Sequence, residues 1–288
     1  MEFSVIVPTY NRIELLKKTL ESLFRQNFKD YEVIVVNDGS SDGTHEYLSE
    51  LSETSHFTYV HHANSGLAAT RLAGLQHAGG EYIAFTDDDC IVPSDWLEKL
   101  HDAFQRHGIA GVGGSTVTGD PSNPYAQAND MINNYFKSAM NNAGTEVPFL
   151  TGNNVAYTRA CLEKVGGPDK RFRMGAEDRD LLFRVVQAGG TMIYDPSIVV
   201  THYNDADFAQ FVKHQFEFGK GSYLYYASHS RSAKKPARIP ARLYFGLFVH
   251  PFGRYRFGRA LYLSFLTVLA QAAVTVGFAV AAITGTTE

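Results

Sequence analysis

Three consecutive carboxylates are the part of this chain whose chemistry is most specific. Asp87, Asp88 and Asp89 follow the apolar run 82–85, and a helix-like segment begins at Pro93. Adjacent acids repel one another unless a cation binds them, and Mg²⁺ or Mn²⁺ takes oxygen ligands while keeping substrate phosphates in its other positions. The triplet therefore indicates either a divalent-metal site or, without a partner, a solvated acidic turn.

Further polar motifs stand where other strands are expected to end. Asp38 is a carboxylate in a turn, while Asn64 and Arg71 offer amide and guanidinium donors to a base or diphosphate. The chain has no G-x-G-x-x-G after its first strand and no G-x-x-x-x-G-K-[ST], which disfavours a dinucleotide fold and a P-loop. The other candidates are the loop Pro8, Thr9, Tyr10, Asn11 and Arg12, the turn Gly152, Asn153 and Asn154, the pair Glu177 and Asp178, and His202.

The elements that position these motifs alternate between strand and helix. Hydrophobic periodicity predicts strands over 3–7, 31–36, 57–61 and 82–85, with helices over 15–24, 42–51 and 66–78 between them. We expect a doubly wound, mostly parallel sheet with flanking helices, which binds ligands at the carboxyl ends of its strands. Later in the chain we expect strands over 109–112 and 198–201, a partly helical stretch over 120–144 and a helix from Glu177 to Gly189.

Charge is distributed unevenly along the 288 residues, whose formal net charge is −4. Residues 218–287 contain nine Lys or Arg and no Asp or Glu, which leaves 17 basic and 29 acidic side chains over 1–217. An acidic part followed by a basic, apolar tail argues against nucleic acid as a partner and for an anionic membrane surface. Two cysteines, Cys90 and Cys161, without metal-ligand spacing indicate a reducing compartment, and the N-terminus reads as a strand rather than a signal peptide.

The tail predicts a membrane attachment. Residues 260–283 carry no charge and would span about 36 Å as a helix, more than the roughly 20 residues that a bilayer crossing needs. We expect a catalytic domain over 1–227, a basic and aromatic segment over 228–259 and a transmembrane helix over 260–283. Because the basic residues precede the span, the catalytic domain is expected in the cytoplasm. A buried core helix is the alternative.

Taken in order, these motifs resemble the family 2 glycosyltransferases of the GT-A fold over residues 3–220. The resemblance rests on Pro-Thr-Tyr-Asn-Arg, Asn-Asp-Gly-Ser, Asn-x-Gly with a later Arg, Asp-Asp-Asp, Thr-Gly-Asn-Asn, Glu-Asp and a late His. It implies a nucleotide-sugar donor, by family habit a UDP-sugar, and a Mn²⁺ or Mg²⁺ cofactor. It also implies transfer with inversion, to a membrane-proximal or lipid-linked acceptor in glycan or polysaccharide synthesis.

Residue by residue, the resemblance implies distinct roles. Asp38 would read the base, and Asp87 and Asp89 would serve ribose and metal. Asp178 would be the general base, although Glu177 beside it stays open for that role. Donor contacts would come from Pro8, Thr9, Tyr10, Arg12, Asn64, Arg71 and Asp88, and the wall towards the acceptor from Gly152, Asn153 and Asn154.

Two positions remain open within the resemblance. His202 is either a supplementary ligand of the metal or diphosphate or an ordinary histidine at a strand end. The Gln-x-x-Arg-Trp signature of processive relatives is absent, since the corresponding stretch is His214–Lys220 and the sole Trp is Trp96. Transfer of a single sugar is therefore favoured, with Lys220 near the acceptor or diphosphate.

Two other classes of function remain as alternatives. A nucleotidyltransferase of related fold would use the same acids on a nucleoside triphosphate, and a non-catalytic homologue would only bind sugar. The sequence leaves open the sugar, the acceptor, the linkage and the oligomeric state.

Overall fold

The computed structural model describes residues 1–55, 57–141, 149–173, 175–230 and 240–285. These residues form two compact units, which we describe separately. The first unit comprises Met1–Val117, Leu150–Arg173 and Glu177–Tyr203, and the second comprises Thr118–Phe149, Met174–Ala176 and Asn204–Glu288 as far as they are described. The catalytic domain expected over 1–227, the segment over 228–259 and the transmembrane helix over 260–283 stay predictions.

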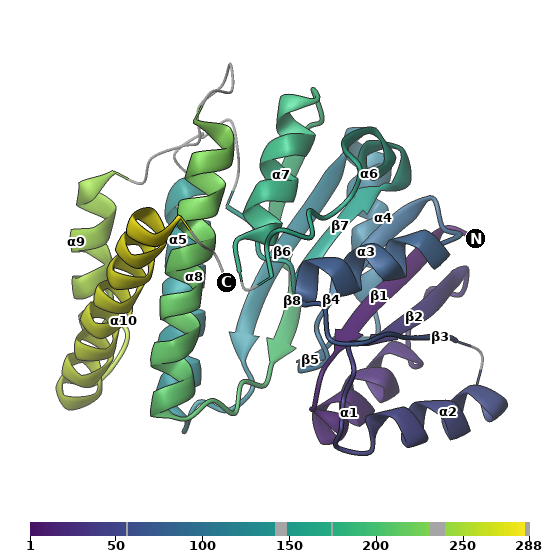
Figure 1. The fold of residues 1–288 in the computed structure, drawn as a ribbon, viewed down its shortest axis with the longest axis horizontal. Helices are drawn as coiled ribbons and strands as arrows, with labels where there is room; N and C mark the ends of the chain where they lie inside the picture. Colours follow the sequence, from purple (N-terminus) through teal and green to yellow (C-terminus); the bar gives the residue numbers. More distant parts are fainter. Residues whose placement is uncertain (56, 142–148, 174, 231–239, 286–288) are drawn as a thin grey trace. The chain divides into compact units, whose positions relative to one another are not determined.

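The first unit is built on a mixed sheet, in which eight strands of the described residues follow the order β3-β2-β1-β4-β7-β6-β8-β5 (Figure 1). Val5, Ile6 and Val7 of β1 are completely buried, as expected for a strand covered on both faces. The strands are β1 (Phe3–Thr9), β2 (Tyr31–Asn37), β3 (Thr58–His61), β4 (Tyr82–Thr86), β5 (Cys90–Ile91), β6 (Gly111–Thr118), β7 (Asn154–Thr158) and β8 (Met192–His202).

The two halves of this sheet differ in strand direction. Strand β1 pairs in parallel with β2 and β4, and β2 pairs in parallel with β3, so the predicted α/β arrangement is confirmed. Strand β7 then runs antiparallel to both β4 and β6, and β5 runs antiparallel to β8. These antiparallel strands return the chain to the carboxyl end of β4, because β7 begins at Asn154 opposite Thr86.

Helices cover the sheet of the first unit. Leu16 and Leu20 of one helix and Leu97 and Leu100 of another belong to a buried apolar cluster of this unit. Helix α4 begins at Trp96, three residues after the predicted start at Pro93. The helices are α1 (Ile13–Leu23), α2 (Thr44–Thr54), α3 (Leu67–His77), α4 (Trp96–His107), α6 (Arg159–Val165) and α7 (Glu177–Gln187).

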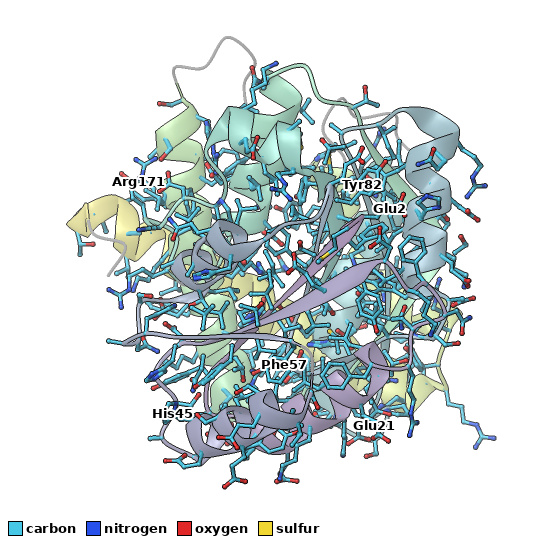
Figure 2. The ribbon with its side chains drawn as sticks, turned by 90° about the vertical axis from the view of Figure 1, so that its right-hand side faces the viewer. Glu2, Glu21, His45, Phe57, Tyr82 and Arg171 are labelled. Carbon is cyan, nitrogen blue, oxygen red and sulfur yellow. The ribbon has the colours of Figure 1, made fainter. Side chains whose placement is uncertain are left out.

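The starts and ends of the parallel strands carry different residues. At the starts, Tyr82 donates its backbone N–H to the carbonyl of Glu2 (2.8 Å), and Figure 2 shows both side chains together at this end. The candidate acids Asp38 and Asp87 directly follow the carboxyl ends of β2 and β4. The sheet therefore separates a structural end from the end that bears the candidate chemistry.

The second unit is helical. It contains α5 (Pro124–Asn141), α8 (Phe208–His229), α9 (Ala241–Val249), a 3₁₀ turn (His250–Gly253) and α10 (Phe257–Thr284). Its buried cluster joins Phe136 of α5, Phe211 of α8, Leu247 of α9 and Leu263 of α10. The partly helical stretch expected over 120–144 is the continuous helix α5 up to Asn141, and residues 142–144 lie outside the described residues, as do residues 231–239 of the expected basic segment.

Helix α10 combines two different faces. Within the described residues it is the helix long and apolar enough to cross a membrane, judged by length and composition alone. Leu263, Leu266 and Ala270 on one face are completely buried within the second unit. Phe265 and Ile283 on the other face are 58% and 86% exposed. Both the expected span and its alternative, a core helix, describe only part of this arrangement.

Candidate active site

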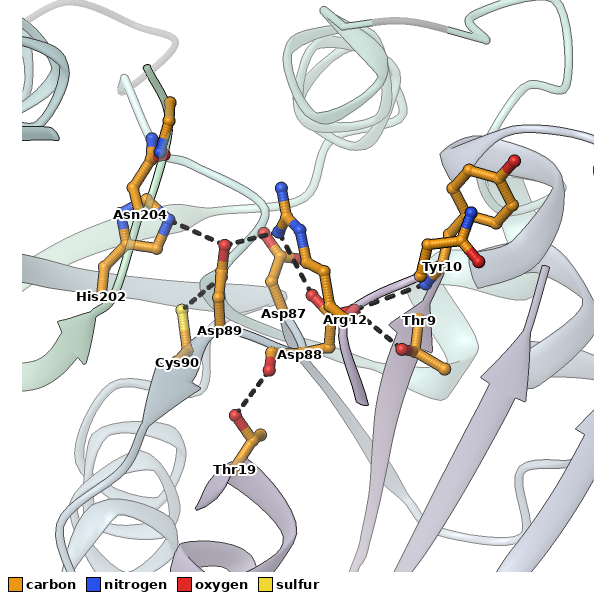
Figure 3. A network of polar contacts seen from close by, with 12 residues as sticks. Thr9, Tyr10, Arg12, Thr19, Asp87, Asp88, Asp89, Cys90, His202 and Asn204 are labelled. Carbon is orange, nitrogen blue, oxygen red and sulfur yellow. Dashed lines mark hydrogen bonds and ion pairs between the residues drawn. The ribbon is translucent and has the colours of Figure 1, made fainter. Parts of the chain in front are cut away.

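The three acids after β4 diverge although they are adjacent in the chain, and Figure 3 shows Asp88 near Thr9 and Asp89 near His202. Asp87 contacts Arg71 of α3, Asp88 contacts Thr9 at the end of β1, and Asp89 contacts His202 at the end of β8. Short irregular segments at strand ends allow successive side chains to diverge in this way. The triplet therefore links two clusters of polar residues in the first unit.

Arg71 organises the first cluster. Its Nη2 donates to Asp87 Oδ1 at 2.7 Å and its Nη1 donates to Glu177 Oε1 at 2.8 Å, while the side chain is only 4% exposed. Burial acts to lower the pKa of Arg71, but the neighbouring Asp87 and Glu177 carboxylates raise it above its usual range. The guanidinium is therefore a permanent charge that holds the triplet beside the start of α7.

Gly152 closes this cluster from the loop before β7. Its backbone N–H donates to Asp178 Oδ2 at 3.1 Å, and a Cβ on Gly152 would overlap the guanidinium of Arg71. Asp178 Oδ1 also accepts from the backbone N–H of Arg179 at 2.7 Å. The Thr-Gly-Asn-Asn motif thus needs glycine here so that the loop can lie on Arg71 and orient Asp178.

Glu177 and Asp178 have different surroundings despite being neighbours. Glu177 is buried, and burial together with the Asp178 charge raises the pKa of Glu177 to about 7. Asp178 is only partly buried. A carboxylate of a partly buried residue that two backbone N–H groups orient suits proton transfer better than one committed to a buried arginine.

A small pocket lies beside Arg71. Arg71, Gly152, Tyr157, Glu177 and Asp178 are among its lining residues, and its free volume for a water-sized sphere is about 10 Å³. Among the described residues, Arg71 Nε and Glu177 Oε2 are buried without a hydrogen-bond partner. Both atoms belong to residues that line this pocket, whose volume is at the lower limit for one water molecule.

Arg12 joins the second cluster. Its Nη1 lies 2.6 Å from Asp89 Oδ2 and 3.3 Å from Asp88 Oδ1, and its side chain is 44% exposed. Asp88 Oδ2 also accepts from Thr9 Oγ1 at 2.8 Å. Burial, opposed by the Arg12 charge and assisted by the neighbouring Asp89, raises the pKa of Asp88 to about 7. The partly exposed guanidinium of Arg12 therefore supplies positive charge to the two buried carboxylates.

His202 completes the second cluster through the register of two strands. Cys90 pairs with His202 between β5 and β8, which brings His202 Nε2 to 3.4 Å from Asp89 Oδ2. Although burial acts to raise it, the charges of His202 and Arg12 lower the pKa of Asp89 to about 2. Ligand atoms of Asp89, Cys90 and His202 lie within 4.8 Å of one another, close enough to hold a metal ion.

This donor set fits a divalent cation with Asp89 and His202 as its ligands. A carboxylate oxygen and an imidazole nitrogen are suitable for Mn²⁺. The thiol of Cys90 is completely buried, and burial raises its pKa well above the ordinary value, which disfavours the thiolate form that binds metals. Asp87, expected as a further ligand, instead contacts Arg71 in this structure.

Asp38 lies in a third group, at the end of β2. Its Oδ1 accepts from the backbone N–H of Ser65 at 2.7 Å and its Oδ2 accepts from that of Gly66 at 3.0 Å. Gly66 has a φ of 89°, which favours glycine. Asp38 thus fixes the loop that carries the exposed Asn64, and it is buried rather than open to solvent.

The remaining predicted residues are placed as follows. Tyr10 is exposed beside Arg12, and Pro8 is buried inside β1. The amide of Asn154 accepts from Trp96 Nε1 and donates to the carbonyls of Ser115 and Ile198, so this side chain is used within the fold. Asn153 Oδ1 accepts from Thr151 within its own turn, and Lys220 belongs to the second unit, where it pairs with Glu217 at 3.1 Å.

Sequence reasoning missed two contributors to these clusters. Cys90 was set aside because the chain has no CxxC spacing and no cluster of histidines beside its cysteines, yet the β5–β8 register places Cys90 opposite His202. Thr19 of α1 donates to the backbone carbonyl of Asp88 at 2.9 Å, which helps to fix the acidic turn. A threonine on the apolar face of a helix was the sequence signal for this contact, and the structure buries it completely.

Known proteins resemble this chain in sequence. The profile described as "Glycosyl transferase family 2" matches residues 4–166. Glycosyltransferase GlyA of Streptococcus pneumoniae is 41% identical over 101 residues, which are 35% of this chain and 14% of that protein. Glycosyltransferase AglE of Haloferax volcanii is 27% identical over 222 residues, which are 76% of this chain and 72% of that protein. The chain thus spans only a small part of GlyA but most of AglE.

Solved structures share the fold. Mannosyltransferase PcManGT from Pyrobaculum calidifontis, in complex with GDP-Man and Mn²⁺, aligns with a TM-score of 0.63 at 22% identity over 99% of this chain and 76% of that chain. S. aureus TarS 1-349 in complex with UDP-GlcNAc aligns with a TM-score of 0.59 at 16% identity over 99% of this chain and 92% of that chain. Since the family profile covers more than half of the residues, the chain belongs to glycosyl transferase family 2, with the GT-A fold.

Proposed function

We propose that this glycosyltransferase transfers one sugar, with inversion, from a UDP-sugar to an acceptor hydroxyl in a reaction that uses Mn²⁺ or Mg²⁺. The observation that carries the proposal is the double contact of Arg71, which ties Asp87 at the end of β4 to Glu177 at the start of α7. One buried guanidinium thereby couples the strand end that would bind the donor to the pair that would supply the base.

Asp178 is the proposed general base. Inverting transfer needs a carboxylate that removes the acceptor's proton while the acceptor oxygen attacks the anomeric carbon from the face opposite the diphosphate. Asp178 is partly accessible and oriented by the N–H groups of Gly152 and Arg179. Glu177 is buried against Arg71, so its proposed role is to position the start of α7 rather than to accept the proton.

Asp89 and His202 are the proposed ligands of the cation, with Asp87 on the ribose side. When bound, the cation would supply charge stabilisation for the leaving diphosphate. Arg12 is the proposed contact of the same diphosphate, and its contacts with Asp88 and Asp89 support this role. Asp38 is proposed to shape the base site by holding the loop from Asn64 to Gly66.

The proposed acceptor is a glycan or lipid-linked molecule near a membrane, in glycan or polysaccharide synthesis. Two features support this proposal: the apolar length of α10 and the absence of acidic residues over 218–287. We propose the cytoplasm as the site of catalysis, because the basic residues over 220–259 would be attracted to the anionic cytoplasmic leaflet of a membrane.

A donor screen tests this function. The full-length protein would be incubated with UDP-, GDP- and dTDP-sugars, and separately with nucleoside triphosphates, in the presence of Mn²⁺, Mg²⁺ or a chelator. Released nucleotide and pyrophosphate would be measured. We expect release of nucleoside diphosphate from one sugar donor with metal and its loss with chelator. Consumption of nucleoside triphosphates with release of pyrophosphate would instead support the nucleotidyltransferase alternative.

Asp89→Ala identifies the site in the same assay. We expect loss of transfer and sharply weaker donor binding in the presence of metal, because the variant lacks the carboxylate opposite His202. Asp102→Ala, which removes an acid from the exposed surface of α4, is the matched control and should retain full activity. Undiminished turnover by Asp89→Ala in chelator-treated buffer would contradict the metal site.

A further inference from the structure

We propose that α10 lies in the plane of an anionic membrane, with its outer face in the lipid, rather than crossing the bilayer. The outer face is a stripe of large apolar side chains at helical spacing, each at least 39% exposed: Leu261, Phe265, Val268, Val276, Val280 and Ile283. This inference goes beyond the proposed chemistry, since membrane binding requires neither donor nor acceptor.

The inner face of α10 is committed to α8. A Cβ on Gly277 would overlap the carbonyl oxygen of Phe216, and a Cβ on Gly219 would overlap that of Val274. Farther along the pair, the rings of Tyr223 and Phe278 meet edge to face with centroids 5.5 Å apart. The two helices therefore contact each other at backbone distance over several turns.

The composition of α8 argues against a bilayer crossing by this helix pair. Helix α8 carries Lys213, Glu217 and Lys220, with Lys220 and Glu217 paired at 3.1 Å. Charged side chains are costly in the hydrocarbon interior, so α8 cannot accompany α10 across it. A crossing would require α10 to leave α8, whereas an in-plane orientation keeps the inner contacts and places only the outer stripe in lipid.

The chain from Phe252 to the first residue of α10, Phe257, supplies groups that an anionic membrane surface attracts. Phe252 and Phe257 are 44% and 74% exposed and contact each other with ring centroids 5.9 Å apart. Arg254 and Arg256 between them are also exposed. Two phenylalanines at the lipid boundary with two arginines at the headgroups form a typical interfacial anchor.

A lipid surface fits the stripe better than a protein partner does. Between residues 260 and 285 α10 has no charged side chain, and the hydroxyl of Thr275 donates to the carbonyl of Gln271 in its own helix. The stripe thus offers apolar area without side-chain groups that would specify the register of another protein. The absence of acidic residues over 218–287 matches an anionic partner surface.

Vesicle flotation of the full-length protein tests the surface. We expect binding to vesicles of phosphatidylcholine and phosphatidylglycerol in equal amounts, and roughly tenfold weaker binding of Val268→Glu. Val117→Glu is the matched control, because Val117 is a valine of β6 with a similar exposure, 46% against 52%. Equal binding by Val268→Glu and the wild type would overturn the proposal.

The arginines are tested on the same vesicles. Replacing Arg254 and Arg256 with Gln should weaken binding to the anionic vesicles roughly fivefold per residue and leave binding to pure phosphatidylcholine unchanged. Arg25→Gln, which removes an exposed arginine just after α1, should change neither. Unaltered binding of the double variant to anionic vesicles would contradict the proposed headgroup contacts.

Depth measurements separate an in-plane helix from a span. Nitroxide labels would be attached to cysteines at Leu261, Val268, Val276 and Ile283 in a Cys161→Ser background, with the buried Cys90 retained. An in-plane helix predicts similar shallow depths at all four positions. A depth that is greatest at the two central positions would show a span, and labels that stay outside the lipid while the protein forms dimers would show a second copy on the stripe. Either result would overturn the proposal, and intact nucleotide release in the same preparation would leave the proposed chemistry standing.

Discussion

Two arginines contact the acidic triplet, and they differ in what surrounds them. Arg71 bridges Asp87 and Glu177 with its side chain 4% exposed, whereas Arg12 bridges Asp88 and Asp89 with its side chain 44% exposed. When a buried arginine is separated from its partners, unpaired charges remain where water cannot solvate them. An exposed arginine exchanges its partners for water at little cost in free energy. We infer that Arg71 is a fixed part of the site and that Arg12 can yield its position to a cation.

The largest expected effect on stability comes from replacing Arg71, the fixed arginine. Arg71→Met should lower the free energy of unfolding by about 3–5 kcal/mol, because Asp87 and Glu177 would lose their shared charge partner. Arg12→Met should lower it less, by about 1–3 kcal/mol, because solvent screens the half-exposed guanidinium although its loss leaves two buried carboxylates. Urea unfolding followed by fluorescence of Trp96, the only tryptophan and completely buried in the first unit, measures both. Equal effects of the two variants would remove the distinction between the arginines.

Gly152→Ala disturbs the same cluster without changing its charge. The added Cβ would overlap the Arg71 guanidinium, so we expect a loss of about 1–3 kcal/mol in unfolding free energy together with reduced turnover. Gly258→Ala, at a position with open space around the new methyl group, is the control and should leave stability nearly unchanged. A stable and fully active Gly152→Ala variant would show that the loop does not depend on its contact with Arg71.

The pH dependence of the free energy of unfolding tests the environment of Glu177, a partner of Arg71. Burial and the Asp178 charge raise the pKa of Glu177 to about 7, so between its ordinary value and 7 the folded protein holds a proton that the unfolded chain has released. The contribution of Glu177 to the free energy of unfolding therefore falls as the pH rises through that interval. Glu177→Gln should make the slope of unfolding free energy against pH less negative by up to about 1.4 kcal/mol per pH unit between pH 5 and 7. Parallel slopes for variant and wild type would contradict this environment.

The smallest expected effect comes from replacing Arg12, the arginine that can yield its position to a cation. Arg12→Gln should tighten the binding of Mn²⁺ in the absence of donor by about two- to fivefold, because the guanidinium no longer competes for Asp89. Titration calorimetry of both proteins measures this change. Unchanged or weaker Mn²⁺ binding would mean that Arg12 does not compete with the cation.

Much of the first unit could be predicted from local sequence. Strands β1 to β4 are apolar runs that end in polar turns, so periodicity locates them and the parallel topology follows from the alternation with helices. Strand β7 could not be oriented from sequence, because its direction depends on pairing with β4 rather than on its own residues. The same limit applied to Cys90, whose proximity to His202 arises from the register of β5 and β8.

The candidate site residues were identifiable, but their connections were not. Arg71 was expected as a donor contact, yet it bonds a residue 106 positions later in the chain, and no local pattern indicates that pairing. For the tail, the apolar length of α10 was evident, whereas its close contact with α8 was not. Small residues such as Gly277 look alike in a lipid-exposed helix and in a packed one, so only the partner helix distinguishes the two.

Asp178→Asn is the most direct test of the proposed mechanism. Nucleotide release and donor binding would be measured for this variant, for Glu177→Gln and for the wild type under identical metal conditions. We predict that Asp178→Asn binds donor normally and loses turnover by about two to four orders of magnitude, because the amide cannot accept the acceptor's proton. Glu177→Gln should retain more turnover than Asp178→Asn. Loss of donor binding together with turnover in Asp178→Asn, or full turnover by that variant, would contradict its assignment as the base.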